Sequence, residues 1–159
     1  MSTSGENRRE KIEQLTREMR LMSSFDALFS HAVAERVGMH QTDIETMDLL
    51  NTIGPMTAGE LSERTGLSSG ATTRLIDRME RAGYVRRRRD EVDRRSVIVE
   101  PIEENLGEIG ALFQPLVDGL LALWAGLGNE ELDVIIRFIR ESNQVTAGVN
   151  ARLRSGDPD

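Results

Sequence analysis

The residues best suited to chemistry in this sequence are arginines gathered in one stretch of the chain. Ten arginines and five acids fall between residues 64 and 95, so the stretch carries about +5 in a chain whose total is −7, which leaves about −12 for the remainder. A guanidinium keeps its charge at physiological pH and carries five N–H donors, so it suits phosphate and other anions. Positive charge gathered in an acidic chain predicts a surface for a polyanion. The alternative interpretation is a charged face exposed to solvent.

The segment that begins this stretch predicts a helix whose outer face carries short side chains. Ala71, Leu75 and Met79 recur at four-residue spacing, and a glycine ends the pattern. Such a helix fits the major groove of B-form DNA, about 12 Å wide, where hydroxyls bond bases and arginine bonds guanine O6 and N7. Ser68 or Ser69 supplies the N-cap, and capping is the main role expected of Ser68. For the hydroxyl residues, plain helix surface is the alternative. The side chains expected to contact DNA on this helix are Ser68, Ser69, Thr72, Thr73, Arg74 and Arg78.

Two β-rich runs follow, at residues 84–89 and 96–100, and predict a hairpin with an exposed tip. Side chains alternate between the two faces of a strand, so the four consecutive arginines of the first run divide into two pairs. We expect one pair to face phosphates while the other pairs with acids. The possible pairs are Arg86 with Arg88 and Arg87 with Arg89, and we assign Arg86 and Arg88 to the site.

The tip of the hairpin combines an acid with two arginines. Asp93 and Arg95 lie two residues apart, and Arg94 stands between them. Such an acid holds an arginine extended over the minor groove, where narrow A·T tracts concentrate negative potential. The alternative is a surface ion pair worth less than about 1 kcal/mol. We therefore predict Arg94 and Arg95 as DNA contacts and Asp93 as their support.

Capping boxes mark two helix starts before the DNA-facing helix. They are Thr42-Asp-Ile-Glu45 and Thr57-Ala-Gly-Glu60, and Gly66 ends the second of these helices. The three short helices with tight turns predict a helix-turn-helix, to which the hairpin adds a wing. Pro101 is expected in the first turn of the helix that follows. The first of the three helices is predicted to bury Ile44, Met47, Leu50 and Ile53.

Long helices are predicted on both sides of this unit. Over residues 8–38 apolar side chains recur every three or four positions until Gly38, and residues 102–154 carry further apolar stripes, with Asn129 as the expected cap of the last helix. A long helix with one apolar stripe cannot bury it on a small domain alone, so a second copy of the chain is the predicted cover. The first stripe contains Ile12, Leu15, Met19, Met22, Phe25, Phe29, Ala32 and Val37.

Composition bounds the remaining possibilities. The chain has 159 residues, 38% of them apolar and 30% charged, which suits one small domain at residues 42–101 with flanking assembly helices. The absence of cysteine excludes disulfides and thiol ligation of a metal. Neither an apolar signal core nor a membrane-length apolar run is present, so we expect a cytoplasmic protein with no membrane contact. The tails at 1–7 and 155–159 are expected to be disordered.

A family resemblance follows from the central motif. The run Gly66-Leu-Ser-Ser-Gly-Ala-Thr-Thr-Arg-Leu-Ile-Asp-Arg-Met-Glu-Arg-Ala-Gly-Tyr-Val85, followed by Asp90-Glu-Val-Asp-Arg-Arg-Ser-Val97, resembles the MarR family of winged helix-turn-helix transcription regulators. The resemblance implies a recognition helix at residues 68–82, a minor-groove arginine at position 95 and a homodimer joined through the terminal helices. It also implies, in many members, a small-molecule site between the dimer helices and the DNA-binding lobe. The chain departs from the family pattern after the wing, where Pro101-Ile102 stands in place of Leu-Thr.

Other chemistries have weaker support in the sequence. A pocket for an organic effector is predicted from apolar side chains at Phe25, Phe29, Met47 and Phe113, although the same spacing fits core or dimer seam. His31 with Glu35, and His40 near Asp43 and Asp48, offer metal-ligand chemistry, but nothing fixes a third ligand. The chain shows no nucleophile–base pairing and no phosphate-binding glycine loop, so we predict neither an enzyme nor a cofactor.

These observations predict a mainly α-helical fold with a small β-hairpin wing and with dimerisation helices at both ends. The expected function is a dimeric, sequence-specific regulator of transcription that binds double-stranded DNA at an inverted repeat, most simply a repressor released by a small molecule. Two other functions stay open at this point. One is a metal-responsive regulator, and the other is a winged-helix module that binds proteins and not DNA.

Overall fold

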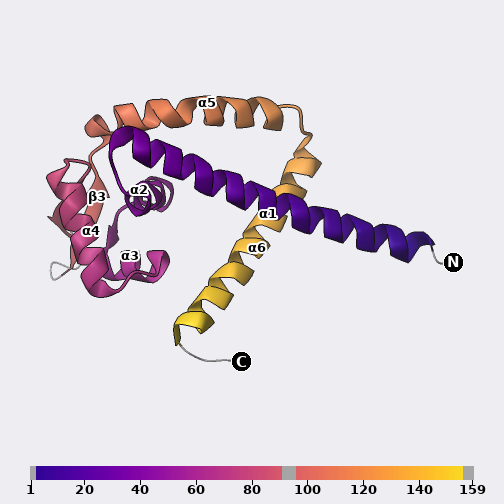
Figure 1. Ribbon diagram of the computed structural model, residues 1–159, viewed down its shortest axis with the longest axis horizontal. Coiled ribbons are helices and arrows are strands. Elements are labelled where there is room, and N and C mark those ends of the chain that lie inside the picture. The colour runs from indigo at the N-terminus through magenta and orange to yellow at the C-terminus, as the bar shows by residue number, and fades with distance from the viewer. Residues whose placement is uncertain (1–2, 91–95, 156–159) are drawn as a thin grey trace. The chain divides into compact units, whose positions relative to one another are not determined.

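The computed structural model describes residues 3–90 and 96–155, and it divides the chain into two compact units. The first unit ends at Leu106 and the second begins at Gly107 (Figure 1). The predicted fold class, mainly α with a small β-hairpin wing, is confirmed.

Helix α1 (Thr3–Val37) starts five residues before the predicted Arg8 and stops where the sequence indicates. Gly38, with φ of +68°, provides the left-handed turn that ends it. The predicted apolar stripe is exposed along most of the helix. Ala32 is exposed too, and the buried side chains are Val33 and Ala34 near the end that contacts α2.

Helix α2 (Gln41–Ile53) begins earlier than its predicted capping box. The N-cap is His40, whose N–H points at Asp43 Oδ2 at 3.4 Å, so the box predicted at Thr42 and Glu45 is wrong. Thr42 already lies inside the helix, where its carbonyl accepts a hydrogen bond from the Thr46 hydroxyl. The predicted burial of Ile44, Met47 and Leu50 is confirmed, whereas Ile53 at the open end of the helix is exposed.

Helices α3 (Ala58–Thr65) and α4 (Ser69–Arg81) form the predicted helix-turn-helix. The capping box at the start of α3 is confirmed, because the Thr57 N–H donates to Glu60 Oε2 at 2.7 Å and the Glu60 N–H donates to Thr57 Oγ1 at 3.2 Å. Gly66, with φ of +75°, ends α3. Ser68 caps α4 by accepting the Ala71 N–H at 3.3 Å, as the sequence predicts. Because caps and glycine stops depend on residues close together in the chain, they could be predicted from the sequence alone.

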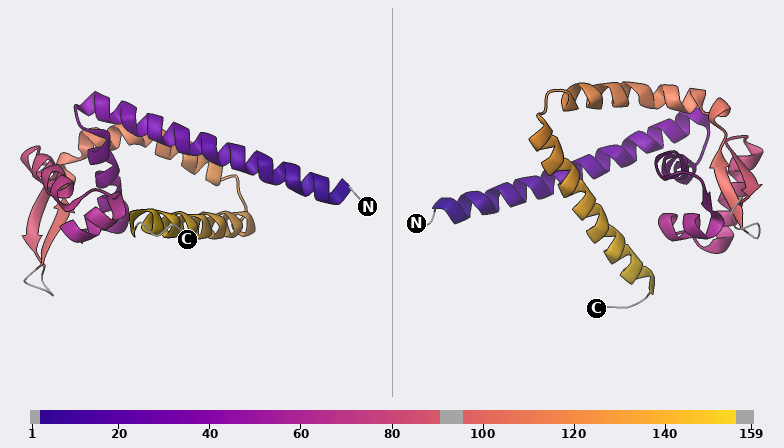
Figure 2. Two further views of the ribbon diagram at one scale, coloured as in Figure 1. Left: turned by 60° about the horizontal axis from the view of Figure 1, so that its bottom comes forward. Right: turned by 180° about the vertical axis from the view of Figure 1, so that it is seen from behind.

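Three short strands complete this unit in the antiparallel order β1-β3-β2. They are β1 (Met56–Thr57), β2 (Val85–Arg89) and β3 (Val97–Pro101), and Figure 2 shows β2 and β3 paired along their length. The hairpin was predicted and β1 was not, since a two-residue strand carries no readable alternation. Pro101 pairs with Val85 as the last residue of β3, so its predicted place in a helix is wrong. The chain continues through η1 (Glu103–Asn105).

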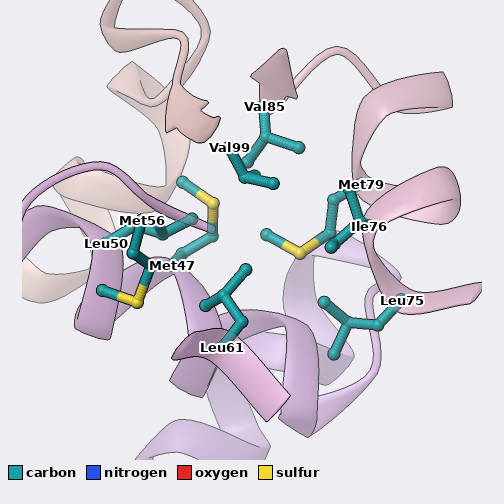
Figure 3. Close-up of a cluster of buried hydrophobic side chains, with 9 residues drawn as sticks. All are labelled: Met47, Leu50, Met56, Leu61, Leu75, Ile76, Met79, Val85 and Val99. Atoms are coloured by element: carbon teal, nitrogen blue, oxygen red, sulfur yellow. The ribbon is translucent and has the colours of Figure 1, made fainter. Parts of the chain in front are cut away.

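One apolar core joins these helices and strands (Figure 3). Burying a side chain of this size stabilises the fold by about 1.5–3 kcal/mol, so the cluster fixes α4 against both α2 and the sheet. Leu67, Tyr84 and Leu106 pack at its edge. The buried cluster consists of Met47, Leu50, Met56, Leu61, Leu75, Ile76, Met79, Val85 and Val99.

The second unit consists of α5 (Gly107–Trp124), with Pro115 in its interior, and α6 (Asn129–Ser155). Asn129 is the first helical residue of α6, and the preceding Gly128 N–H donates to Glu131 Oε2, so Asn129 is not the cap. Many large apolar side chains of these helices are exposed. Among the helices of the described ranges, none is both long enough and apolar enough to cross a bilayer.

Candidate nucleic-acid interface

Three residues of α4 that were predicted to face outward have exposed side chains. Ser69, Thr73 and Arg74 are exposed, and the Thr73 hydroxyl donates to the Ser69 carbonyl at 3.0 Å within the same helix. Small side chains near the helix start leave room for close approach of a groove wall. Arg74 extends a fixed positive charge from the same surface. The core residues Leu75, Ile76 and Met79 hold this face outward.

Thr72 does not belong to this exposed face. Its side chain is 1% exposed, and its hydroxyl donates to the Ser68 carbonyl at 3.1 Å. The prediction that Thr72 contacts DNA is therefore wrong. Thr72, Leu75, Ile76 and Met79 form the buried side of α4, and Ala71, predicted to be buried, is only half-buried. Threonine is small enough to sit in a core once its hydroxyl bonds its own helix.

Arg78 is bound by α2. Its Nε donates to Asp43 Oδ2 at 2.8 Å and its Nη2 donates to Asp43 Oδ1 at 2.5 Å, while Asp43 itself is 1% exposed. The hydrogen bonds to Asp43 raise the pKa of Arg78 above its ordinary value. A buried carboxylate with a two-point arginine partner joins two helices that lie 35 residues apart in sequence. The guanidinium edge predicted to face DNA is thus occupied by protein.

Arg86 and Arg88 share one acid on the adjacent strand. Arg86 Nε donates to Glu100 Oε1 at 2.6 Å, and Arg88 Nε donates to Glu100 Oε2. The hydrogen bonds from Arg88 and Arg86 lower the pKa of Glu100. Arg86 and Glu100 are direct cross-strand neighbours, so hairpin register places all three groups on one face. Arg86 and Arg88 therefore pair with an acid, which the sequence analysis expected of the other pair, and their contact with phosphates stays a prediction.

Arg87, on the opposite face of β2, forms ion pairs with α4. Its Nη2 donates to Asp77 Oδ1 at 2.5 Å, its Nη1 donates to Glu80, and its backbone N–H donates to Glu80 Oε1 at 3.2 Å. Burial acts to lower the pKa of Arg87, but the hydrogen bonds to Asp77 and Glu80 outweigh it and raise that pKa. Three of the four consecutive arginines therefore have acidic partners.

Four other arginines of the 64–95 stretch, Arg64, Arg74, Arg81 and Arg89, are exposed. Among the described residues, no carboxylate forms an ion pair with Arg64, Arg74 or Arg89, and all three side chains are exposed. Arg64 lies on α3 and Arg89 lies at the end of β2. Neither was among the residues assigned to the site from sequence, although both fall within the arginine-rich stretch. Glu100 could have indicated Arg89 from the sequence. It lies opposite Arg86 in the hairpin, so it favours the face of Arg86 and Arg88 as the one that pairs with an acid, and Arg89 is on the other face.

Comparison with known proteins identifies the family. The MarR family profile matches residues 39–97, which hold the helix-turn-helix and most of the wing. The HTH-type transcriptional regulator YcgE of Bacillus subtilis is 38% identical over 149 residues, covering 93% of this chain and 97% of the relative. This chain belongs to the MarR family of HTH-type transcriptional regulators. A further relative, the HTH-type transcriptional regulator YfiV of Bacillus subtilis, is 36% identical over 74 residues, which make up 46% of each chain.

Solved structures agree with the MarR assignment. A MarR family protein from Bacillus stearothermophilus matches with a TM-score of 0.63 and 25% identity, over 87% of this chain and 96% of that one. A MarR transcriptional regulator from Methanosarcina mazei matches with a TM-score of 0.60 and 18% identity, over 86% and 99%. At that identity the second likeness supports the fold alone.

Two groups of predicted MarR site residues remain predictions. Asp93, Arg94 and Arg95 lie outside the described residues. Phe113 belongs to the second unit, while Phe25 of α1 is 65% exposed and Phe29 is half-buried. Met47 lies in the buried core of Figure 3.

A hollow of about 400 Å³ occurs elsewhere in the first unit, at the end of α2 and the base of the wing. None of the four predicted pocket residues lines it. Its walls are Leu50, Asn51, Gly54, Pro55, Arg86, Glu100, Pro101, Glu103 and Glu104.

Within the described residues, neither histidine is joined by the set of ligands that a metal site needs. His31 Nε2 lies 3.6 Å from Glu35 Oε1 on the surface of α1. Asp43, expected beside His40, is bound by Arg78. Within the described ranges, no three side chains of the ligating types come together in a group able to hold a metal ion.

Proposed function

We propose that this MarR-family regulator binds double-stranded DNA sequence-specifically as a homodimer, with α4 in the major groove. The observation that carries the proposal is the outer face of α4, where Ser69, Thr73 and Arg74 are exposed on a helix held rigidly by the core. A helix in the groove reads bases with such side chains, and arginine is the commonest reader of guanine. Arg74 is the proposed base reader.

Phosphate contacts are proposed for the exposed cations around that helix. Arg64 on α3 and Arg89 on β2 lie on either side of α4 in the chain and form no ion pair among the described residues. Phosphate contacts fix the register of a protein on the duplex without reading its sequence. Arg94 and Arg95, supported by Asp93, are proposed to extend the contact into the minor groove.

A second copy of the chain is the proposed cover for the exposed apolar side chains of the long helices. Leu15, Met22 and Phe25 on α1, and Ile136 and Ile139 on α6, are all exposed in the single chain. Apolar residues in such number on long helices are typical of surfaces that pair. A two-fold dimer presents two recognition helices about 34 Å apart, and therefore selects an inverted repeat.

Selection of bound duplexes from a random pool, followed by fluorescence anisotropy with the selected duplex, tests DNA binding. Arg74→Ala should weaken binding and lose about 1–3 kcal/mol of discrimination at one base pair. Arg89→Ala should weaken binding to all duplexes alike and reduce the salt slope by about 0.9. Arg9→Ala, which removes an exposed arginine from α1, is the matched control. A pool from which no duplex is enriched at low salt refutes the proposal and favours a protein-binding module.

Light scattering after size exclusion tests the dimer. The expected mass is twice 17.8 kDa, and Ile139→Asp should produce single chains, whereas Arg137→Asp on the same helix should not. A wild-type protein that elutes as a single chain at micromolar concentration contradicts the dimer.

Regulation by a small molecule is proposed as the release signal of a cytoplasmic repressor. A compound that binds the free protein more tightly than the DNA-bound protein must weaken DNA binding by that ratio. Screening by thermal shift, followed by anisotropy with the selected duplex, tests this part. A library that yields stabilising compounds, none of which changes DNA affinity, contradicts it.

A further inference from the structure

The recognition helix carries two acids that oppose its proposed role. Asp77 and Glu80 lie in the second half of α4, three and six residues after Arg74, and both side chains are substantially exposed. Carboxylates near a DNA backbone are repelled by phosphates, and the repulsion is strong where water is displaced. A helix with these acids left unpaired is a poor partner for DNA.

Arg87 meets both acids at once. Its two terminal nitrogens bind Asp77 and Glu80 separately, and its backbone N–H binds the second oxygen of Glu80. Val85 lies two residues before Arg87 on the same face of β2 and is buried in the core. The strand that carries Arg87 is therefore fixed against α4. The Arg87 side chain is 31% exposed, against 63% for Arg86 on the solvent face.

We propose that Arg87 is a positioning residue that neutralises Asp77 and Glu80 and locks the recognition helix to the wing, and that it makes no DNA contact of its own. The inference rests on the proposed DNA-binding function and adds a role for a residue within it. Arg78 is held by Asp43 on α2, so α4 is tied by ion pairs to α2 as well as to β2. The charge that α4 presents outward is then set by Arg74 and Arg81.

Arg87 differs in this respect from a phosphate-binding arginine. A guanidinium that binds a phosphate directs its donors at the ligand, whereas both terminal nitrogens of Arg87 are directed at carboxylates of its own chain. Loss of Arg87 therefore exposes two negative charges on α4 as well as removing one positive charge. Removing the acids together with Arg87 should undo most of the damage.

A mutant cycle with the selected duplex tests the proposal. The variants are Arg87→Gln, the pair Asp77→Asn with Glu80→Gln, and the triple combination, with Arg9→Gln as the control for charge. We expect Arg87→Gln to weaken binding by about tenfold or more, and the acid substitutions to strengthen binding at least about fivefold more in the Arg87→Gln background than in the wild-type background. Thermal unfolding confirms that each variant is folded.

The cycle also separates failure of the inference from failure of the proposed function. Equal effects of the acid substitutions in both backgrounds overturn the positioning role, because Arg87 then acts independently of the acids. A salt slope reduced by about 0.9 in the triple variant, relative to the acid double variant, also overturns it, because that reduction indicates a lost phosphate contact. If the wild-type protein selects no duplex, the proposed function fails and the inference fails with it.

Discussion

The ion pair between Arg78 and Asp43 gives the sharpest test of how the recognition helix is held. Arg78→Ala removes both hydrogen bonds to Asp43, and leaves a carboxylate that is 1% exposed with only a 3.4 Å contact to the His40 N–H. Two unit charges about 4 Å apart attract by about 4 kcal/mol at an effective dielectric of 20. Removing one partner of a buried pair costs about 3–5 kcal/mol. Since the Arg78 side chain is 37% exposed, water can reach the vacated position, and we expect a loss of about 3 kcal/mol.

Urea unfolding at one fixed protein concentration measures this loss as a change in the free energy of unfolding. With a denaturant slope of about 2 kcal/mol per molar, the midpoint should fall by about 1.5 M. Arg74→Ala, one turn earlier and exposed, is the matched control and should change stability by less than about 0.5 kcal/mol. Combining Arg78→Ala with Asp43→Asn removes the stranded charge and should recover part of the loss, since an unpaired neutral amide costs about 1–3 kcal/mol. A loss below about 1 kcal/mol in Arg78→Ala would refute this account of the buried pair.

Three further predictions concern other parts of the first unit. Thr57→Ala removes the cap that bonds the Glu60 N–H and should lower the free energy of unfolding by about 1 kcal/mol, measured by urea unfolding. The lowered pKa of Glu100 means that its ionised form stabilises the fold above its unfolded-state pKa of about 4.3, and that this contribution is lost as pH falls through the folded-state pKa. The stability difference between wild type and Glu100→Gln should therefore shrink as pH falls from 7 to 3, and a difference that grows would contradict the ion pairs. Thr72→Val keeps the shape of a buried side chain and should leave DNA affinity within about twofold, because Thr72 is not at the surface; a tenfold loss in anisotropy would return it to the interface.

Most local features of this chain could be predicted because their causes are local. Gly38 and Gly66 end helices through a left-handed turn, and Ser68 and Thr57 cap helices through atoms three residues away. The early start of α2 was missed because Thr42 and Glu45 fit the capping-box pattern better than His40 and Asp43, which form the cap in the structure. Sequence spacing cannot choose between two such registers when both offer an acceptor side chain.

The partners of the arginines could not be predicted in the same way. Arg78 and Asp43 are 35 residues apart and are brought together by helix packing, while Arg88 and Glu100 are 12 apart and are brought together by the register of the hairpin. Strand alternation correctly divided the four consecutive arginines between two faces of β2. It did not show that arginines on both faces have acidic partners. The same limit applies to Thr72. Its hydroxyl favoured an exposed position in the sequence analysis, whereas tertiary packing buries the side chain.

By itself the sequence determined the winged helix-turn-helix, its family and the region of positive charge, because periodicity, caps and glycine stops act within a few residues of one another. Tertiary structure alone decided which of the clustered cations have an acidic partner. Arg64, Arg74 and Arg89 face solvent, while neighbours of the same type are bound by acids from distant segments. The physical reason is that the electrostatic character of a charged side chain depends on what lies within a few ångströms of it, and folding sets those neighbours.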